Sequence, residues 1–450
     1  MSASIFKAYD IRGLVDGEIT PDFTFATGAA FARFLKQERE PGTVVIGEDM
    51  RPSSPELADA FSAGVTSQGL DVIRIGLAST DMLYFAAGKL NLPGAMFTAS
   101  HNPAAYNGIK MCLSGARPIG KESGLLLIEK YVNEGSPIPL NQVGVERHEE
   151  MLEDYVSHLL EMVNLSATRP LKIVIDAGNG MAGHTAPAVF KRLNAEVVEM
   201  YYELDGTFPN HEANPIDPKN LRDLQAAVLE HKADIGLAFD GDADRCFLVD
   251  EKGDLVNPSA LTGLIATREL VKYPGSTIIY NLISSKSVKE VVEENGGTAV
   301  RSRVGHSYIK KLMAETGAVF GGEHSGHFYF RDFWRADSGM LAALYAIAAL
   351  GEKVVPLSQL FAPFNRYASS GEINSTVSDA AAATKLIEDH YGAMAGVELD
   401  RLDGLTVTGD TWWFNLRASN TEPLLRLNVE ATTEQEMAAI RDSVLNTIRA

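Results

Sequence analysis

The sequence predicts three related mixed α/β domains followed by a smaller C-terminal α+β domain. Three observations support this prediction. The chain has 450 residues, which is more than one hydrophobic core normally organises and suggests roughly three to four domains. Strand-like apolar runs alternate with helix-like segments, and this pattern restarts twice along the chain. After residue 365 the alternation gives way to a shorter arrangement of strands and helices.

The expected elements follow this order. The first unit has strands over residues 43–46 and 70–75 and a helix over residues 55–68, capped by Ser53 or Ser54. The second unit has strands over residues 171–176, 196–200 and 234–239 and a helix over residues 187–193. The third unit has strands over residues 277–280, 298–301 and 318–321 and helices over residues 287–294 and 308–315. The last unit has strands over residues 371–377 and 424–429 and helices over residues 380–391 and 434–449.

Two segments read as linkers between these units. Residues 135–145 carry Pro, Gly and Asn, and residues 354–363 contain two prolines. With the break after the second unit, these segments predict domains over residues 1–145, 146–250, 251–363 and 364–450.

The composition is that of an ordinary globular protein, with 45% hydrophobic and 22% charged residues. A net charge of −19 disfavours a nucleic-acid surface, and it means that an anionic ligand needs a local basic pocket. Cys112 and Cys246 lie in apolar segments and are expected to be buried free thiols. The N-terminus lacks a signal-peptide core, and the longest apolar run, residues 340–350, is too short to span a bilayer. We therefore expect a cytoplasmic protein that binds neither nucleic acid nor membrane. A monomer or a weak dimer is expected, although none of these observations specifies the oligomeric state.

The loop Thr98-Ala99-Ser100-His101-Asn102-Pro103 is the first candidate for chemistry because it follows a strand-like run. Ser100 reads as a nucleophile or a phosphate site. Adjacent residues on an extended loop point in different directions, so His101 is expected to be a poor general base for Ser100. No Gly-x-Ser-x-Gly elbow surrounds the serine. A serine hydrolase is therefore disfavoured, and a purely structural Asn-Pro turn is the remaining alternative.

The loop Asp240-Gly241-Asp242-Ala243-Asp244 places three carboxylates at the end of a predicted strand. They converge only if the backbone curls, which the small residues between them permit. Three hard oxygen ligands suit Mg²⁺ or Ca²⁺. An EF-hand is disfavoured because Arg245 stands where a glycine is needed and because the flanks read as strands. Mg²⁺ with an incomplete protein shell is preferred over a solvated acidic turn, and a phosphorylated Ser100 would complete that shell.

Two later loops are rich in polar groups. Residues 321–327 offer Glu323 and Ser325 for sugar hydroxyls and His327 for proton transfer. Residues 417–423, with Arg426 beyond them, combine arginine forks with hydroxyl and amide donors, which suits a dianionic phosphate. A glycine-rich hairpin and a solvated polar loop are the structural alternatives. The basic residues available to offset the acidic net charge are Arg12, Lys110, Arg245, Lys286, His306, Arg417 and Arg426, of which Arg12 is expected in a loop before Gly13.

Four loops of these types, in this order, resemble the α-D-phosphohexomutase superfamily. Residues 98–103, 240–245, 322–327 and 417–423 are similar to its phosphoserine, metal, sugar-binding and phosphate-binding loops. Residues 9–13 and 176–180 also fit, so the resemblance covers essentially the whole chain. The Gly-Glu-His-Ser-Gly-His sugar loop resembles the phosphomannomutase/phosphoglucomutase branch. His324 stands where phosphoglucosamine mutases usually have Gln and where well-known dual-specificity members have Met.

The resemblance implies four domains around a central cleft and a reversible phosphoryl transfer between Ser100 and hexose 6- or 1-phosphates. A bisphosphohexose would be the intermediate and activator, and the substrates would be phosphates of mannose and glucose. The implied activity is that of a phosphomannomutase, with phosphoglucomutase as an open addition. A phosphoglucosamine mutase and a non-catalytic phosphosugar-binding protein are the alternatives.

The resemblance also implies roles for individual residues. Ser100, Asp240, Asp242 and Asp244 would hold Mg²⁺. The catalytic candidates are Ser100, Arg12, Lys110, His101, Arg245 and His327, and the general base stays open among Arg12, Lys110 and His327. The substrate-binding candidates are Tyr9, Lys286, Gly305, His306, Glu323, Ser325, His327, Arg417, Ser419, Asn420, Thr421 and Arg426.

Overall fold

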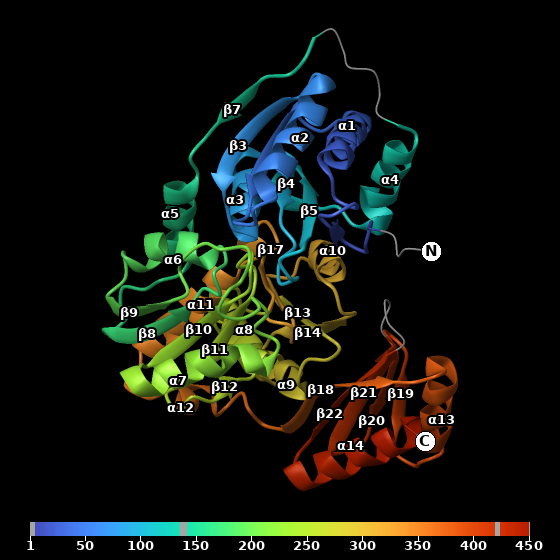
Figure 1. Ribbon diagram of the computed structural model, residues 1–450. Coiled ribbons are helices and arrows are strands. Elements are labelled where there is room, and N and C mark those ends of the chain that lie inside the picture. The colour runs from blue at the N-terminus through green and yellow to red at the C-terminus, as the bar shows by residue number, and fades with distance from the viewer. Residues whose placement is uncertain (1–4, 136–141, 419–423, 450) are drawn as a thin grey trace.

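The computed structural model describes residues 5–135, 142–418 and 424–449, and it arranges them around four β-sheets (Figure 1). The first three sheets mix parallel and antiparallel strands, and the fourth is antiparallel throughout. Each sheet is built from a consecutive stretch of chain. The predicted fold class, three mixed α/β units and a smaller α+β unit, is confirmed.

The first sheet has the strand order β1-β5-β4-β2-β3-β7, with β6 beside β5. Its strands are β1 Ile11–Leu14, β2 Thr43–Glu48, β3 Asp71–Leu77, β4 Gly94–Phe97, β5 Tyr106–Leu113, β6 Arg117–Pro118 and β7 Glu146–His148. Its helices are α1 Pro21–Glu38, α2 Ser54–Ser67, α3 Thr80–Leu90 and α4 Leu126–Asn133. Strands β2 and β4 are parallel neighbours, so the turn after Glu48 and the loop after Phe97 emerge at the same edge of the sheet.

The second sheet has the order β12-β11-β10-β8-β9 and the third the order β14-β13-β15-β16-β17. The strands of the second are β8 Leu171–Asp176, β9 Ala195–Met200, β10 Ile235–Phe239, β11 Cys246–Val249 and β12 Leu255–Val256. Those of the third are β13 Thr277–Asn281, β14 Thr298–Ser302, β15 Phe320–Gly322, β16 Phe328–Phe330 and β17 Ala336–Asp337. The helices of this region are α5 Leu152–Met162, α6 Ala182–Phe190, α7 Arg222–His231, α8 Pro258–Lys272, α9 Lys286–Glu294, α10 His306–Thr316, α11 Gly339–Gly351 and α12 Leu357–Phe361.

The fourth sheet has the order β18-β22-β21-β20-β19 and packs against two helices. Its strands are β18 Ala368–Thr376, β19 Glu398–Asp400, β20 Leu405–Thr408, β21 Trp412–Ala418 and β22 Leu424–Ala431, and its helices are α13 Ala380–Gly392 and α14 Glu434–Ile448. This unit, red in Figure 1, lies at one end of the molecule and contacts the third unit, where the Val304 amide donates to Asp403 Oδ2 at 3.3 Å.

The hydrophobic cores also separate the fourth unit from the first three. One continuous cluster joins buried side chains of all three mixed sheets and includes every residue of α11 from Met340 to Leu350. The antiparallel sheet has a separate cluster of its own. The first three units are therefore one packed body, because separating them would expose a large apolar area.

Most expected elements are present, and three expectations are wrong. The helix expected over residues 187–193 is α6, which begins at Ala182 and contains Pro187 in its interior. The prolines of residues 354–363 predicted a linker, but Leu357 and Phe361 are buried and form α12 between them. Arg12, expected in a loop, lies on strand β1 and pairs with Gly108.

Other sequence expectations hold. Cys112 and Cys246 are buried free thiols. Strands β10 and β11 flank the acidic loop, as expected for a site that is not an EF-hand. Across the residues that the structure describes, no helix combines the length and the apolar character needed to cross a membrane.

Candidate active site

Ser100 lies in the loop between β4 and β5, and its side chain is buried. Its φ angle of +50° falls in the left-handed region, which is uncommon for a residue other than glycine. The Ser100 amide donates to Thr98 Oγ1 at 2.9 Å, and Ser100 Oγ donates to Asp240 Oδ2 at 2.8 Å. The serine of the first sheet is therefore in direct contact with the acidic loop of the second.

The expectation that His101 points away from Ser100 is wrong. His101 Nδ1 lies 3.2 Å from Ser100 Oγ. Because Ser100 turns left-handed, the two side chains do not alternate as they would on an extended strand. Burial, with the nearby Arg245 and Arg12, holds the pKa of His101 well below its usual range. The neutral ring is thus a hydrogen-bond partner of the serine.

Arg51, which the sequence reasoning missed, organises this loop. Its side chain is fully buried, and its Nε lies 3.2 Å from Asp49 Oδ2. Its two Nη atoms donate to four backbone carbonyls of the loop, those of Ser100 at 3.0 Å, Asn102 at 2.7 Å, Pro103 at 2.9 Å and Tyr106 at 2.9 Å. The available signal was a pair of opposite charges directly after a parallel strand, at the edge where the Ser100 loop also emerges.

Asp240, Asp242 and Asp244 converge between β10 and β11, and all three are buried. Each offers a carboxylate oxygen within 4.8 Å of the others. Ala243 has a φ of +59°, which curls the loop as expected. A Cβ atom on Gly241 would lie 2.4 Å from the Ser100 carbonyl oxygen, so only glycine allows the two loops to approach this closely.

Lys110 and Thr80 fix the middle carboxylate. Lys110 Nζ lies 2.6 Å from Oδ2 of both Asp242 and Asp244. Thr80 Oγ1 donates to Asp242 Oδ2 at 2.5 Å, and the Thr80 amide donates to the Asp242 carbonyl at 3.0 Å. Burial opposes the charge on Lys110, but the two carboxylates outweigh it and raise the pKa of the amine well above its usual value. Burial alone would also raise the pKa of Asp242, but Lys110 lowers it.

The acidic cluster fits a divalent cation. Among the described residues, Asp242 Oδ1 and Asp244 Oδ1 are buried without a hydrogen-bond partner. Burial and the two neighbouring aspartates raise the pKa of Asp240 well above its usual value. A cation would satisfy the two oxygens and remove the repulsion, and three carboxylate oxygens are ligands that Mg²⁺ accepts.

Two arginines border this cluster. Arg245 Nε lies 3.6 Å from Asp240 Oδ2. Arg12 donates to Asn102 Oδ1 at 2.7 Å in the serine loop and forms an ion pair with Asp10. Burial opposes the charge on Arg12, but Asp10 outweighs it and raises the pKa of the guanidinium. The neighbouring carboxylates therefore stabilise the protonated forms of both Arg12 and Lys110.

The sugar loop brings Glu323 and Ser325 together after β15. Glu323 is buried and accepts hydrogen bonds from Tyr329 Oη, from Asn281 Nδ2 at 3.4 Å and from Ser325 Oγ at 3.3 Å. The neighbouring His324 turns to Ser259 on α8, with 3.0 Å between Nδ1 and Oγ, and burial lowers its pKa to about 4.

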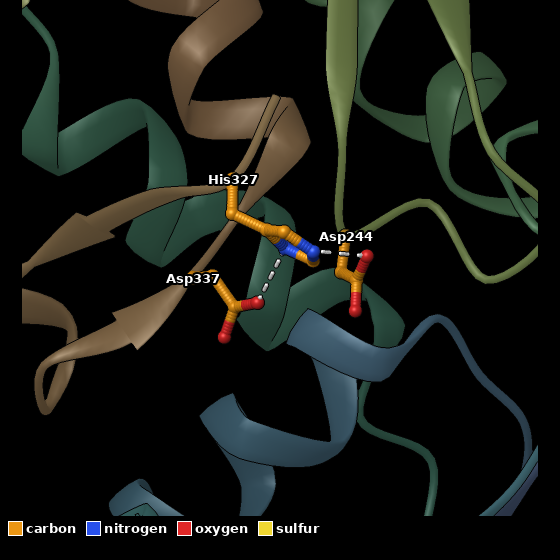
Figure 2. Close-up of side chains that lie close together, drawn as sticks. All are labelled: Asp244, His327 and Asp337. Atoms are coloured by element: carbon orange, nitrogen blue, oxygen red, sulfur yellow. Dashed lines mark hydrogen bonds and ion pairs between the residues drawn. The ribbon is translucent and has the colours of Figure 1, made fainter. Parts of the chain in front are cut away.

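His327 lies between two carboxylates (Figure 2). Its Nδ1 is 2.9 Å from Asp337 Oδ2 and 3.6 Å from Asp244 Oδ1, so the ring joins the sugar loop to the acidic cluster. Buried Lys310 lies 2.7 Å from the other oxygen of Asp337. Asp337 and Lys310 were not predicted, because nothing in the local sequence marks them as partners of a histidine.

The arginines of the C-terminal unit line a cavity of about 450 Å³, whose walls come from the first, third and fourth units. Its polar and aromatic walls are Tyr9, Arg303, Tyr308, Asp403, Arg417 and Arg426. Gly305 closes one side with a φ of +127°, and a Cβ atom there would lie 2.1 Å from Tyr9 Oη. Arg303, Tyr308 and Asp403 were not predicted.

The remaining predicted residues lie elsewhere or are not described. Lys286 begins α9 and is exposed, and its amide donates to Glu430 Oε2 at 2.9 Å. It is not among the residues lining the cavity. His306 begins α10. Ser419, Asn420 and Thr421 fall outside the described residues.

These features define a class: a four-unit α/β protein in which a serine contacts a buried cluster of three aspartates and arginines of the last unit line a cavity. Comparison with known proteins narrows the class. Residues 3–137, 153–253, 257–367 and 372–447 match, in order, the models of domains I, II and III and of the C-terminal domain of phosphoglucomutase/phosphomannomutase. The chain belongs to the phosphoglucomutase/phosphomannomutase family, and the resemblance to the α-D-phosphohexomutases is confirmed.

Individual relatives agree with this assignment. A phosphomannomutase of Salmonella typhimurium is 40% identical over 98% of this chain and 97% of its own length. A protein of Xanthomonas campestris pv. campestris named for phosphohexose mutases is 40% identical over 100% of this chain and 99% of its own. A crystal structure of a phosphoglucomutase/phosphomannomutase family protein from Burkholderia thailandensis superposes with a TM-score of 0.90 at 32% identity, covering 100% of this chain and 98% of that one.

Proposed function

We propose that the protein is a phosphomannomutase, an isomerase that interconverts hexose 6-phosphate and hexose 1-phosphate. The observation that carries this proposal is the contact between Ser100 Oγ and Asp240 Oδ2 at 2.8 Å, within a buried group of three aspartates. A serine held against a cation site is suited to carry a phosphoryl group, because charge neutralisation and positioning supply most of the catalysis of this transfer. Relatives named phosphomannomutase that match over nearly their whole length favour mannose phosphates as substrates.

In this proposal phospho-Ser100 donates its phosphoryl group to the free hydroxyl of a hexose phosphate, and a bisphosphohexose forms. The bisphosphohexose turns over and returns its other phosphoryl group to Ser100, so no phosphate is gained or lost. Asp240, Asp242 and Asp244 would hold Mg²⁺, which when bound screens the negative charge of the phosphoryl group. Lys110 and Arg245 border the same place and add positive charge.

The remaining site residues have distinct tasks in the proposed reaction. Glu323 accepts hydrogen bonds from sugar hydroxyls, and Ser325 can both accept from them and donate to them. Arg417 and Arg426 bind the phosphate that is not being transferred. His327 is the proton acceptor for the attacking hydroxyl, because the neighbouring carboxylates stabilise the protonated forms of Lys110 and Arg12. Asp337 holds its Nδ1, which fixes the ring in the way that a carboxylate orients a catalytic histidine.

Ser100→Ala tests the proposal directly. The variant should lose mutase turnover on mannose 1-phosphate, and the mass increment of one phosphoryl group should disappear from the intact protein. Retained turnover would exclude the phosphoserine mechanism. The same assay with glucose 1-phosphate and glucosamine 1-phosphate ranks the substrates, and a preference for glucosamine 1-phosphate would contradict the assignment to mannose.

A further inference from the structure

Two arginines lie directly opposite each other in the C-terminal sheet. Arg417 on β21 is the register partner of Arg426 on β22, and both line the cavity beside Tyr9. Like charges that face each other on neighbouring strands repel. The pair therefore requires a negative group close by, and the phosphate of a bound sugar phosphate is one such group.

The protein already places a negative group at this position. Glu372 on β18 reaches both arginines, with Oε2 at 3.7 Å from Arg417 Nη2 and Oε1 at 3.5 Å from Arg426 Nη1. Asp403 Oδ2 lies 3.6 Å from Arg417 Nη1 on the other side. These separations are longer than charge-assisted hydrogen bonds. The carboxylates thus compensate the charge of the arginines without occupying their N–H donors.

The carboxylates lower the net positive charge of the cavity. Among the residues that the structure describes, Arg303, Arg417 and Arg426 line the cavity, and Glu372 and Asp403 offset two of these three positive charges. Without Glu372 the cavity would carry one more uncompensated positive charge, and Arg426 would lose the carboxylate that it shares with Arg417, while Asp403 would still pair with Arg417. A bound anion would then relieve the repulsion between Arg417 and Arg426. Both effects strengthen anion binding.

We propose that Glu372 is an internal counter-ion that weakens the affinity of this cavity for phosphate. The inference rests on the proposed function, in which the same arginines must bind one phosphate of the bisphosphohexose, release it and bind the other. Tight binding of the intermediate would slow this exchange, because binding energy realised in a stable complex does not raise turnover. Glu372 acts on the substrate through the arginines and is a positioning and tuning residue rather than a catalytic one.

A counter-ion role and a purely structural role of Glu372 predict opposite changes in phosphate affinity, so the inference can be tested. If Glu372 only held the arginines in place, its removal would disorder them and weaken phosphate binding. If it is a counter-ion, Glu372→Gln tightens binding. Both ion pairs are partly exposed, and each such pair changes a binding constant by roughly twofold to fivefold. Loss of both pairs should therefore lower the Kd by roughly fourfold to twenty-five-fold.

The experiment is calorimetric titration of the wild-type protein and Glu372→Gln with inorganic phosphate and with mannose 1-phosphate. The expected result is a lower Kd for both probes, a lower KM for mannose 1-phosphate and a kcat that does not rise. An unchanged or higher Kd would overturn the inference. Glu372→Asp keeps the charge and should bind phosphate as the wild type does, whereas tightening by this variant too would assign the effect to shape instead of charge.

Glu398→Gln is the matched control. Glu398 is an exposed glutamate of the same sheet and lies on the edge strand β19. Its register partner is Thr408 on β20, and the register partner of Thr408 on β21 is Trp413, four residues before Arg417. Removing this charge should leave the Kd unchanged, and an equal tightening would show a general charge effect and overturn the inference. Phosphate binding without mutase turnover in the wild type would refute the proposed function alone.

Discussion

Arg51→Lys is expected to loosen the Ser100 loop and to lower turnover while the protein stays folded. The arginine contacts four backbone carbonyls of the loop and the carboxylate of Asp49. A lysine keeps the positive charge, so Asp49 is not left unpaired in the interior. It has only three N–H donors, however, and it lacks the planar fork of the guanidinium.

The size of the effect follows from this count of donors. At least two of the five contacts are lost, and a hydrogen bond to a charged group is worth about 1.5–3 kcal/mol. The closed loop should therefore lose about 3 kcal/mol or more relative to its open forms, which is roughly a hundredfold in the opening equilibrium. Two amides report this opening, those of Asn102 and Tyr106, which donate within the loop to Ala99 and Pro103 at 3.0 Å.

Hydrogen exchange of peptides that cover residues 98–108 measures the opening, and steady-state turnover measures its consequence. Arg33→Lys is the control, because Arg33 is an exposed arginine of the same unit that pairs with Glu134 at 2.7 Å, and such pairs contribute under about 1 kcal/mol. Unchanged exchange in Arg51→Lys would refute the structural reasoning. Faster exchange with wild-type turnover would refute the link between a rigid loop and catalysis.

Three further predictions concern the contacts of the first unit with the second and third units. Thr80→Val removes the hydroxyl that donates to Asp242 Oδ2 and should weaken Mg²⁺ activation of turnover by about tenfold to a hundredfold, measured by Mg²⁺ titration; an unchanged Mg²⁺ requirement would contradict the role of Thr80. Gly241→Ala forces a Cβ atom to 2.4 Å from the Ser100 carbonyl and should lower kcat, whereas Gly42→Ala, where no atom lies within 4 Å, should not. Asp81 accepts hydrogen bonds from Tyr155 and Ser338, and burial raises its pKa to about 6. Because the folded-state pKa is above the unfolded value near 3.9, its contribution to stability is complete below pH 4 and is lost as the pH rises through 6, by roughly 3 kcal/mol at most. Denaturant unfolding gives the free energy of unfolding of the wild type and of Asp81→Asn at each pH. The difference between the two should decline between pH 4 and 6, and a difference that does not change with pH would exclude this contribution.

The sequence was sufficient for features that are local. Strand and helix alternation predicted the three mixed units, and the spacing of the three aspartates predicted that their carboxylates converge, which they do. The sequence-based prediction failed where tertiary packing overrides a local preference. Proline at 187 suggested a helix start, yet it lies inside α6. The prolines around residues 357–361 suggested a linker, yet burial of Leu357 and Phe361 stabilises a short helix there.

The missed site residues share one property: each acts on a group that is distant in the sequence. Arg51 binds carbonyls about 50 positions later, and Lys310 reaches Asp337 behind His327. The relation of Glu372 to its arginines depends on the register of β18, β22 and β21. A one-residue slip would move these side chains to the other face, and no local pattern specifies such a register. His101 was misjudged for a different reason, since the left-handed turn at Ser100 cannot be read from an alternation rule.

The net charge of −19 raises the question of how this chain would bind the two phosphate groups of a bisphosphohexose. The structure answers it with cations that are paired before any ligand arrives: Lys110 with Asp242 and Asp244, Arg12 with Asp10, and Arg417 and Arg426 with Glu372. Paired cations stay ordered and protonated in an acidic protein, and they attract phosphate less strongly than free ones. For a reaction in which each phosphate must occupy both places in turn, moderate attraction at both ends is an advantage. An excess of positive charge would instead stabilise one bound orientation and slow the exchange on which the proposed isomerisation depends.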